Sequence, residues 1–327
     1  MNKAILIREL GDASVLRYET RAIPALGPHD VLVRQEAIGV NFIDTMVRSG
    51  RYPAALPTVL GFEAAGVVEA LGSDHLPFAL GDRVGYFFAP NAYADYNVVD
   101  ASALVALPDD ITTTQAAAFL TKGMTAWMGL RALHSLKAGE SILVQGASGN
   151  VGAMVMRWAR HLGATVIGVA GSEQKLSAVA KVAALALVSS DAHFMDKVRA
   201  LQPHGVDVVY DFVGGATFPS SLAAVRNGGK ILTIGAAAGE PWINQDEVAA
   251  RSIQVRGGGT PQYVTPANQS AVAAELFAAI RHGIFDDIDL STHLLKDARV
   301  VHDMIDARLL LGIPVLLPEP HQNHPGA

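Results

Sequence analysis

The stretch VQGASGNVG, at residues 144–152, decides the fold that we expect for this chain. It follows an apolar run, Ser141–Gln145, and precedes a segment whose apolar residues recur at helical spacing. Ala147, Gly149 and Gly152 stand where the dinucleotide-binding fingerprint has its three small residues. In that pattern the middle glycine lets the backbone approach a pyrophosphate, and the last lets the helix pack closely on the sheet. The alternative is a tight strand–helix turn that binds nothing.

The helix that begins in this loop would present unpaired N–H groups and the positive end of its dipole to an anion. We therefore predict that the loop binds a cofactor through six consecutive residues: Ala147, Ser148, Gly149, Asn150, Val151 and Gly152.

The end of the next expected strand bears on the choice between NAD and NADP. That strand ends at Ala170, and no acidic residue stands at its tip to accept a hydrogen bond from a ribose 2′-hydroxyl. Ser172 and Lys175 could instead bind a 2′-phosphate, although Glu173 would repel it unless its side chain points away. We therefore favour NADPH over NADH. The alternative for Lys175 is a solvated helix lysine.

Around the glycine loop, apolar strand candidates alternate with helical segments. Six strands are expected, at Ser141–Gln145, Thr165–Ala170, Ala184–Val188, Val206–Phe212, Lys230–Gly235 and Ser252–Arg256. Six strands separated by helices predict an α/β fold with a doubly wound parallel sheet.

The first third of the chain has a different pattern. Short alternating strands divided by glycines are expected at Asp30–Gln35, Gly61–Leu71, Asp82–Phe88 and Tyr93–Val99, which predicts a compact β-barrel-like domain. After a helix at Gln269–His282, a strand–helix–strand segment follows at Leu290–Leu295, Ala298–Leu311 and Val315–Leu317. We assign that segment to the first domain, which makes this domain discontinuous.

Composition limits the classes of function. The 327 residues suggest two domains, and 50% apolar against 17% charged residues excludes disorder. A net charge of −6 is poorly suited to nucleic acid, and the lack of cysteine excludes disulfides and thiolate zinc sites. No apolar run approaches the ~20 residues of a membrane span, and the N-terminal run is too short for a secretory signal. We expect a cytoplasmic protein with a frayed tail at Pro318–Ala327.

Several segments resemble one family, the zinc-free quinone oxidoreductases (zeta-crystallin-like) of the medium-chain dehydrogenase/reductase superfamily. They lie at residues 39–45, 48–53, 61–66, 81–84 and 146–152. The resemblance implies a GroES-like β-barrel catalytic domain, formed by residues 1–122 and 266–327, and a Rossmann domain at 123–265.

The resemblance also implies the absence of zinc. Zinc-dependent relatives have a cysteine ligand where Asn41 stands and a histidine where Phe62 stands. Without a Lewis acid to lower the pKa of an alcohol, alcohol oxidation is not expected. The chemistry would be hydride transfer from the nicotinamide to a quinone or a conjugated enone, both of which accept hydride without strong activation.

Three polar residues are the catalytic candidates by resemblance: Asn41, Asp44 and Tyr52. Asn41 would donate a hydrogen bond to the developing oxyanion, and Tyr52 a hydrogen bond or a proton. The alternatives are a turn cap for Asn41, a helix cap for Asp44 and a pocket wall for Tyr52. Substrate contacts are expected from Met46, Phe62 and Phe88, of which the two phenylalanines are equally credible as core. Met46 stands where the family often has tyrosine, which leaves the substrate open.

The remaining cofactor contacts also follow from the resemblance. They are Lys122, Thr125, Gly171, Ser172, Lys175, Ser190, Gly235, Ala236, Gly258 and Arg308. Ser189 and Ser190 replace a tyrosine that is common in the family, and Ile313 replaces a lysine. Both replacements weaken the expectation of NADPH.

The first functional hypothesis is an NADPH-dependent, zinc-independent quinone oxidoreductase. The alternative is an NADPH-dependent enone or 2-alkenal (acrylate-type) reductase on the same scaffold. A non-catalytic nucleotide- or RNA-binding protein is a third reading, which the net charge opposes. We expect a homodimer that pairs the edge formed by the sixth strand, with a small-molecule substrate and no nucleic-acid or membrane partner.

Overall fold

A computed structural model describes residues 2–319, and every structural statement below concerns that part of the chain. The chain forms two compact units. Unit 1 comprises Met1–Thr121, Pro266–Ala273 and Ile288–Ala327, and unit 2 comprises Lys122–Thr265 and Ala274–Asp287. From residue 320 onward, the tail that we expected to fray lies outside the described residues.

Unit 2 contains the parallel sheet. Its strands are β9 (Ser141–Gln145), β10 (Thr165–Ala170), β11 (Leu185–Val188), β12 (Val206–Asp211), β13 (Val225–Thr233) and β14 (Gln254–Gly257). All neighbours are parallel, in the order β11-β10-β9-β12-β13-β14. The chain starts in the middle of the sheet, builds one half and then returns to build the other. This is the doubly wound Rossmann order, with β9 at the point where the direction of winding reverses.

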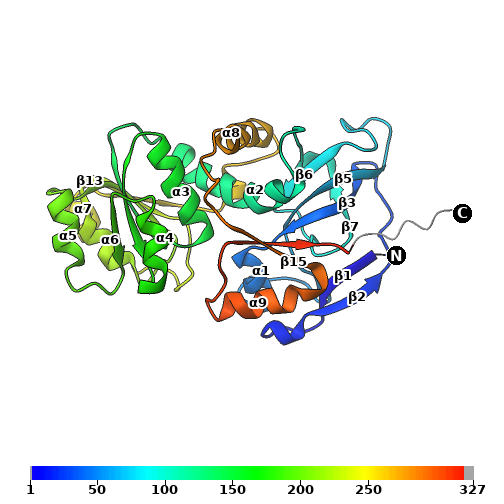
Figure 1. Cartoon of the computed structure of the whole chain (residues 1–327), viewed down its shortest axis with the longest axis horizontal. Helices are drawn as coiled ribbons and strands as arrows, with labels where there is room; N and C mark the ends of the chain where they lie inside the picture. Colours follow the sequence, from blue (N-terminus) through cyan, green and yellow to red (C-terminus); the bar gives the residue numbers. More distant parts are fainter. Residues whose placement is uncertain (1, 320–327) are drawn as a thin grey trace, which may run out of the picture. The chain divides into compact units, whose positions relative to one another are not determined.

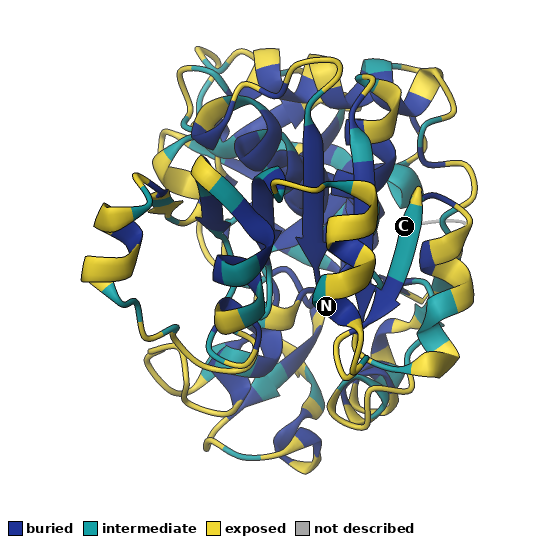
Figure 2. Ribbon diagram, turned by 90° about the vertical axis from the view of Figure 1, so that its left-hand side faces the viewer, coloured by how far each residue is buried: buried dark blue, intermediate teal, exposed yellow. Residues whose placement is uncertain are grey.

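Helices cover both faces of this sheet, as Figure 1 shows. They are α3 (Asn150–His161), α4 (Leu176–Ala180), α5 (Phe194–Leu201), α6 (Phe218–Ala224) and α7 (Gln245–Ala250). A Cβ on Gly168 would lie 2.4 Å from Val179 of α4, so α4 packs directly on β10. The neighbouring Ile167 instead joins the core formed with Phe194 of α5. Consecutive residues of β10 therefore face different helices, and Figure 2 shows the strands buried beneath them.

Unit 1 is built from mostly antiparallel strands. They are β1 (Asn2–Ile7), β2 (Arg17–Arg21), β3 (Asp30–Gly39), β4 (Thr58–Val59), β5 (Glu63–Leu71), β6 (Arg83–Phe87), β7 (Tyr96–Asp100), β8 (Leu104–Ala106), β15 (Leu290–Leu294) and β16 (Ile313–Leu317). They form a small sheet, β2-β1-β4, and a larger one, β15-β16-β3-β5-β6-β8, in which β7 also pairs with β3. Residues of both sheets share one core, which includes Ile5, Val33 and Leu316.

The C-terminal segment joins unit 1 through the larger sheet. β16 pairs antiparallel with β3, so that Val315 lies opposite Gly39. The helix between β15 and β16, α9 (Ala298–Asp306), is shorter than the expected 298–311. It ends because Arg308 takes a left-handed backbone conformation (φ 58°), and the N–H of Leu309 bonds back to the carbonyl of Met304.

Several other expected boundaries also shift. The sixth strand begins at Gln254 instead of Ser252, because Ser252 has a φ of 52° that no strand accommodates. The fifth strand begins at Val225, five residues before the expected Lys230.

Two helices pass from one unit to the other: α2 (Thr113–Trp127), extended by a π-helical turn at Met128–Leu133, and α8 (Gln269–Arg281). The second half of α8 belongs to unit 2, because Glu275 bonds to Trp127 and Leu276 packs on Gly123. The short helix α1 (Phe42–Arg48) belongs to unit 1. Within residues 2–319, no helix is both long and apolar enough to cross a membrane.

Candidate active site

The glycine loop lies at the carboxyl end of β9 and opens α3. Gly149 is the N-cap residue, and no side chain caps the helix. The first N–H groups of a helix have no partner within it, so those of α3 remain available to an anion. A Cβ on Gly149 would lie 3.2 Å from the carbonyl oxygen of Gly146, and one on Gly152 only 2.4 Å from it. The loop therefore fits the pyrophosphate of a dinucleotide, which approaches closest where side chains are missing.

The candidate residues for the 2′-phosphate gather at the ends of β10 and β11. The N–H of Ser189 donates to the carbonyl of Ala170, which ties the two strand ends together. Gly171 and Ser190 are exposed at these ends, and Lys175 is half-buried in the turn that precedes α4. Glu173 is exposed.

The candidates for the nicotinamide side lie at the ends of β13 and β14, the same edge of the sheet. Gly235 packs on Phe212, where a Cβ would lie 2.5 Å from the carbonyl oxygen, and Ala236 follows it. Gly258 has a φ of 141°, which side chains rarely tolerate. The hydroxyl of Thr125 lies 2.8 Å from that of Thr260, just after Gly258. The structure thus brings Thr125 of α2 to the loop after β14, which sequence spacing does not predict.

Two further predicted cofactor residues, Lys122 and Arg308, are described by their exposure and by the unit to which they belong. Lys122 is 2% exposed and lies at the start of unit 2. Arg308 belongs to unit 1 and is exposed in the turn after α9. The role of Arg308 at a phosphate stays a prediction.

Asn41 is held by a buried carboxylate. Its side-chain amide nitrogen donates a 2.8 Å hydrogen bond to Glu63 Oε2, and the N–H of Thr121 donates to Glu63 Oε1 at 2.6 Å. Glu63 is fully buried and Asn41 is 8% exposed. Gly39 leaves the space for Glu63, because a Cβ there would lie 2.3 Å from Oε2. Asn41 is also the N-cap residue of α1, and its backbone carbonyl oxygen accepts the N–H of Asp44.

Asp44 is buried in the first turn of α1. Its Oδ2 accepts the N–H of Asn41 at 2.8 Å and the hydroxyl of Tyr93 at 2.9 Å. The helix-cap alternative for Asp44 thus describes the bond to Asn41, and the bond to Tyr93 is additional.

Tyr52 and Met46 are linked through the backbone. The N–H of Tyr52 donates to the carbonyl of Met46 at 3.0 Å, which folds the chain after α1 back on the helix. The side chain of Tyr52 is 42% exposed, and Met46 is half-buried.

Phe62 and Phe88 form a pair. Their ring centroids are 6.2 Å apart, and both side chains are only partly buried. Phe88 has a φ of 57°, which is unusual for an aromatic residue and costs on the order of 1 kcal/mol or more. Phe62 packs at the edge of the unit 1 core, so the alternative that it is a core residue is partly correct.

Three polar residues with a place at this site were absent from the sequence-based candidates: Glu63, Tyr93 and His302. Glu63 carried a signal, since it is a charged residue in the otherwise apolar stretch 61–68. Tyr93 and His302 carried none, because they come from segments separated by 209 residues.

Among residues 2–319, no group of three or more His, Asp or Glu side chains is arranged to hold a metal ion. The expectation of a zinc-independent site therefore rests on the sequence and stays a prediction.

Comparison with known proteins gives two family matches. Residues 27–109 match the alcohol dehydrogenase GroES-like domain, and residues 150–275 match the family described as zinc-binding dehydrogenase. Quinone oxidoreductase from Pseudomonas aeruginosa is 38% identical, covering 97% of this chain and 100% of the relative. A 2-haloacrylate reductase from Burkholderia sp is 32% identical over 98% of this chain and 100% of the relative. The Escherichia coli quinone oxidoreductase, solved as a complex with NADPH, superimposes with a TM-score of 0.91 at 31% identity, over 97% of this chain and 100% of that one.

A six-stranded doubly wound sheet with a glycine loop, next in sequence to a GroES-like β domain, defines a medium-chain dehydrogenase/reductase. Within that superfamily the chain belongs to the zinc-free quinone oxidoreductase branch, and it is an oxidoreductase by family.

Proposed function

We propose that the chain is an NADPH-dependent quinone oxidoreductase that works without zinc. Unit 2 would be the dinucleotide-binding domain, and unit 1 the catalytic domain. The observation that carries the proposal is the Asn41–Glu63 pair, because it provides an oriented, neutral hydrogen-bond donor in place of a metal ligand. Relatives of similar length that bear the name quinone oxidoreductase support the choice of acceptor.

The bound cofactor would supply the hydride. The N–H groups at the start of α3 would bind its pyrophosphate, and the absence of a side-chain cap leaves them free to do so. Ser172 and Lys175 would bind the 2′-phosphate. The solved NADPH complex of the Escherichia coli relative supports this choice of nucleotide.

Residues of unit 1 would act on the acceptor. Asn41 would donate to the oxygen on which negative charge develops. Tyr52, exposed beside α1, would donate a proton to the same or the opposite oxygen. Met46, Phe62 and Phe88 would provide an apolar wall that excludes water.

The test is a cofactor titration followed by an acceptor panel. We expect NADPH to quench the intrinsic fluorescence of the purified protein at a lower concentration than NADH does. We then expect 1,4-benzoquinone to support NADPH oxidation. Failure of both nucleotides to bind, or binding with no turnover of any acceptor, would refute the proposal.

A second candidate function is reduction of an enone or 2-alkenal of the acrylate type. It is favoured by the 2-haloacrylate reductase among the relatives and by Met46, a thioether that adapts to differently shaped substrates. 3-Buten-2-one belongs in the same panel. If its kcat/KM exceeds that of the quinone by more than about tenfold, or about 1.4 kcal/mol, this second function replaces the first.

A non-catalytic role in RNA binding is the weakest reading, because the chain carries a net charge of −6. Salt-dependent retention of RNA at micromolar protein would support it.

We further propose a cytoplasmic homodimer that pairs β14 of two copies. β14 is an edge of the parallel sheet, and its outer side has no partner strand among the described residues. Sedimentation of the wild-type protein tests the dimer, and a monomer at micromolar concentration would overturn it.

A further inference from the structure

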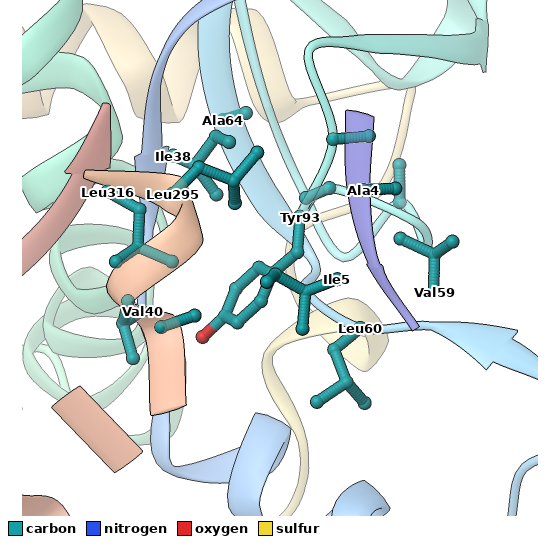
Figure 3. Close-up of a cluster of buried hydrophobic side chains, with 14 of the residues drawn as sticks. Ala4, Ile5, Ile38, Val40, Val59, Leu60, Ala64, Tyr93, Leu295 and Leu316 are labelled. Atoms are coloured by element: carbon teal, nitrogen blue, oxygen red, sulfur yellow. The ribbon is translucent and has the colours of Figure 1, made fainter. Parts of the chain in front are cut away.

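A chain of buried polar side chains crosses the aliphatic core of unit 1. Arg48 Nη1 lies 3.2 Å from His302 Nδ1, His302 Nε2 lies 3.1 Å from the Tyr93 hydroxyl, and that hydroxyl lies 2.9 Å from Asp44 Oδ2. Tyr93, His302 and Asp44 are fully buried, and Arg48 is 3% exposed. Figure 3 shows Tyr93 among aliphatic neighbours that include Ile5, Val40 and Leu60.

The direction of these hydrogen bonds follows from the chemistry of the two ends. A guanidinium only donates, so His302 Nδ1 must accept from Arg48, and the ring proton must lie on Nε2. A carboxylate only accepts, so the Tyr93 hydroxyl donates to Asp44 and accepts from His302. Every donor in the chain therefore points toward Asp44.

Arg48, at the end of the hydrogen-bond chain away from Asp44, is anchored near the surface. Arg48 Nη2 bonds to Asp306 Oδ2 at 2.7 Å, and Arg48 Nε bonds to the carbonyl of Gly11 at 3.2 Å. The Arg48 charge is thereby neutralised, which a buried guanidinium requires.

This chain of hydrogen-bonded side chains is not a proton relay. Transfer toward Asp44 would require Arg48 to give a proton to His302, and arginine does not ionise in proteins. Burial, together with the Arg48 charge, also lowers the pKa of His302 to about 3, so this ring stays neutral. A static chain of donors fixes geometry.

The geometry that it fixes is the entry to α1. Asp44 Oδ2 accepts the Tyr93 hydroxyl and also the N–H of Asn41, at 2.8 Å. One carboxylate oxygen thus joins the core network to the backbone of the residue whose amide faces Glu63. Burying four polar groups in an apolar core is expensive, and aliphatic residues of similar size would often be as stable or more so.

We propose that Tyr93 and His302 are positioning residues for reduction of the acceptor, acting through Asp44 to fix Asn41. This inference rests on the proposed function, in which Asn41 donates to the acceptor. It assigns no chemical step to Tyr93 or His302, since neither touches Asn41 directly.

The experiment compares variants that differ in the direction of the hydrogen bonds. Tyr93→Phe removes the donor to Asp44 and keeps the ring in the core. His302→Leu interrupts the chain, whereas His302→Gln keeps it, because an amide can accept from Arg48 and donate to Tyr93. Tyr86→Phe is the matched control: it removes another fully buried hydroxyl of unit 1, which bonds to Gln35 and Asn97 instead.

We expect Tyr93→Phe and His302→Leu to lower kcat about tenfold, with the KM and Kd for NADPH unchanged. His302→Gln and Tyr86→Phe should keep kcat within about twofold of wild type. Hydrogen exchange of the peptide spanning residues 40–48 should be faster in Tyr93→Phe and unchanged in Tyr86→Phe.

Wild-type kcat in folded Tyr93→Phe would overturn the inference, as would an equal loss in Tyr86→Phe, which would mean general loosening. A wild-type protein that reduces no acceptor would refute the proposed function instead. In that case, or if His302→Leu does not fold, hydrogen exchange in Tyr93→Phe still decides whether the chain holds the start of α1.

Discussion

The side-chain amide of Asn41 and the carboxylate of Glu63 form a 2.8 Å hydrogen bond inside unit 1. Because the carboxylate can only accept, it holds the amide of Asn41 with the nitrogen Nδ2 toward Glu63. Nδ2 carries two hydrogens, and in the proposed function the second N–H of this nitrogen would donate to the acceptor.

Glu63→Gln should therefore lower kcat for the acceptor about tenfold, because glutamine offers both a donor and an acceptor and no longer fixes the amide of Asn41. NADPH affinity should not change. Steady-state kinetics with fluorescence titration checks both. Glu69→Gln is the control on the same strand, since Glu69 is exposed and pairs with Arg34 at 3.3 Å. Equal kcat for Glu63→Gln and wild type would mean that Asn41 does not need its partner.

Gly149→Val should abolish binding of both nucleotides without unfolding the protein. The backbone there is extended (φ −81°), a conformation that valine adopts readily, but the side chain would occupy the approach of the pyrophosphate. Gly152→Ala should instead lower the melting temperature, because its Cβ would lie 2.4 Å from the Gly146 carbonyl oxygen. Thermal shift with and without nucleotide separates the two effects, and NADPH binding by Gly149→Val at wild-type affinity would contradict the loop assignment.

Lys175→Ala should raise the KM for NADPH about tenfold and leave that for NADH unchanged, because only NADPH carries the 2′-phosphate. Lys181→Ala is the control, because Lys181 is an exposed lysine six residues further along the sequence. Kinetics with both nucleotides provides the measurement. If Lys175→Ala weakens both nucleotides equally, its role is structural.

Tyr52→Phe should lower kcat about 100-fold, if the hydroxyl supplies the proton that the acceptor needs after hydride transfer. The control is Tyr96→Phe, on strand β7 of the same unit. The pH dependence of kcat in both variants and in wild type would show whether an acid has been lost. No change in kcat would leave Tyr52 as a pocket wall.

Stability should fall on mild acidification because of His302. Burial lowers the pKa of its folded form to about 3, below the ordinary value of 6.5, so between these values the unfolded state binds the extra proton. The free energy of unfolding should then drop by about 2 kcal/mol between pH 7 and pH 5 from this group. Urea denaturation at both pH values tests this, and His302→Gln should remove that share of the pH dependence. An unchanged slope in the variant would assign the effect to other groups.

The sequence predicted much of unit 2 because its signals are local. A glycine loop between an apolar strand and an amphipathic helix has few structural solutions, and parallel strands must be joined by helices. The errors were at boundaries such as Arg308 and Ser252, where a left-handed residue that is not glycine ended or delayed an element. Helix and strand propensities do not predict such positions.

The candidate site was predictable only where family motifs cover it. Asn41 and Asp44 lie in such a motif, yet their partners do not follow from it. Glu63 is 22 residues from Asn41, and His302 is 254 residues from Arg48. Spacing says nothing about pairs so far apart.

The sequence by itself determined the class of fold, the glycine loop and the lack of thiolate ligands, since each depends on residue types over a few neighbouring positions. The tertiary structure alone decided which buried polar groups face one another. A buried donor or acceptor must find its partner wherever the packed chain brings one, and here the partners of α1 come from β5, the loop before β7 and α9.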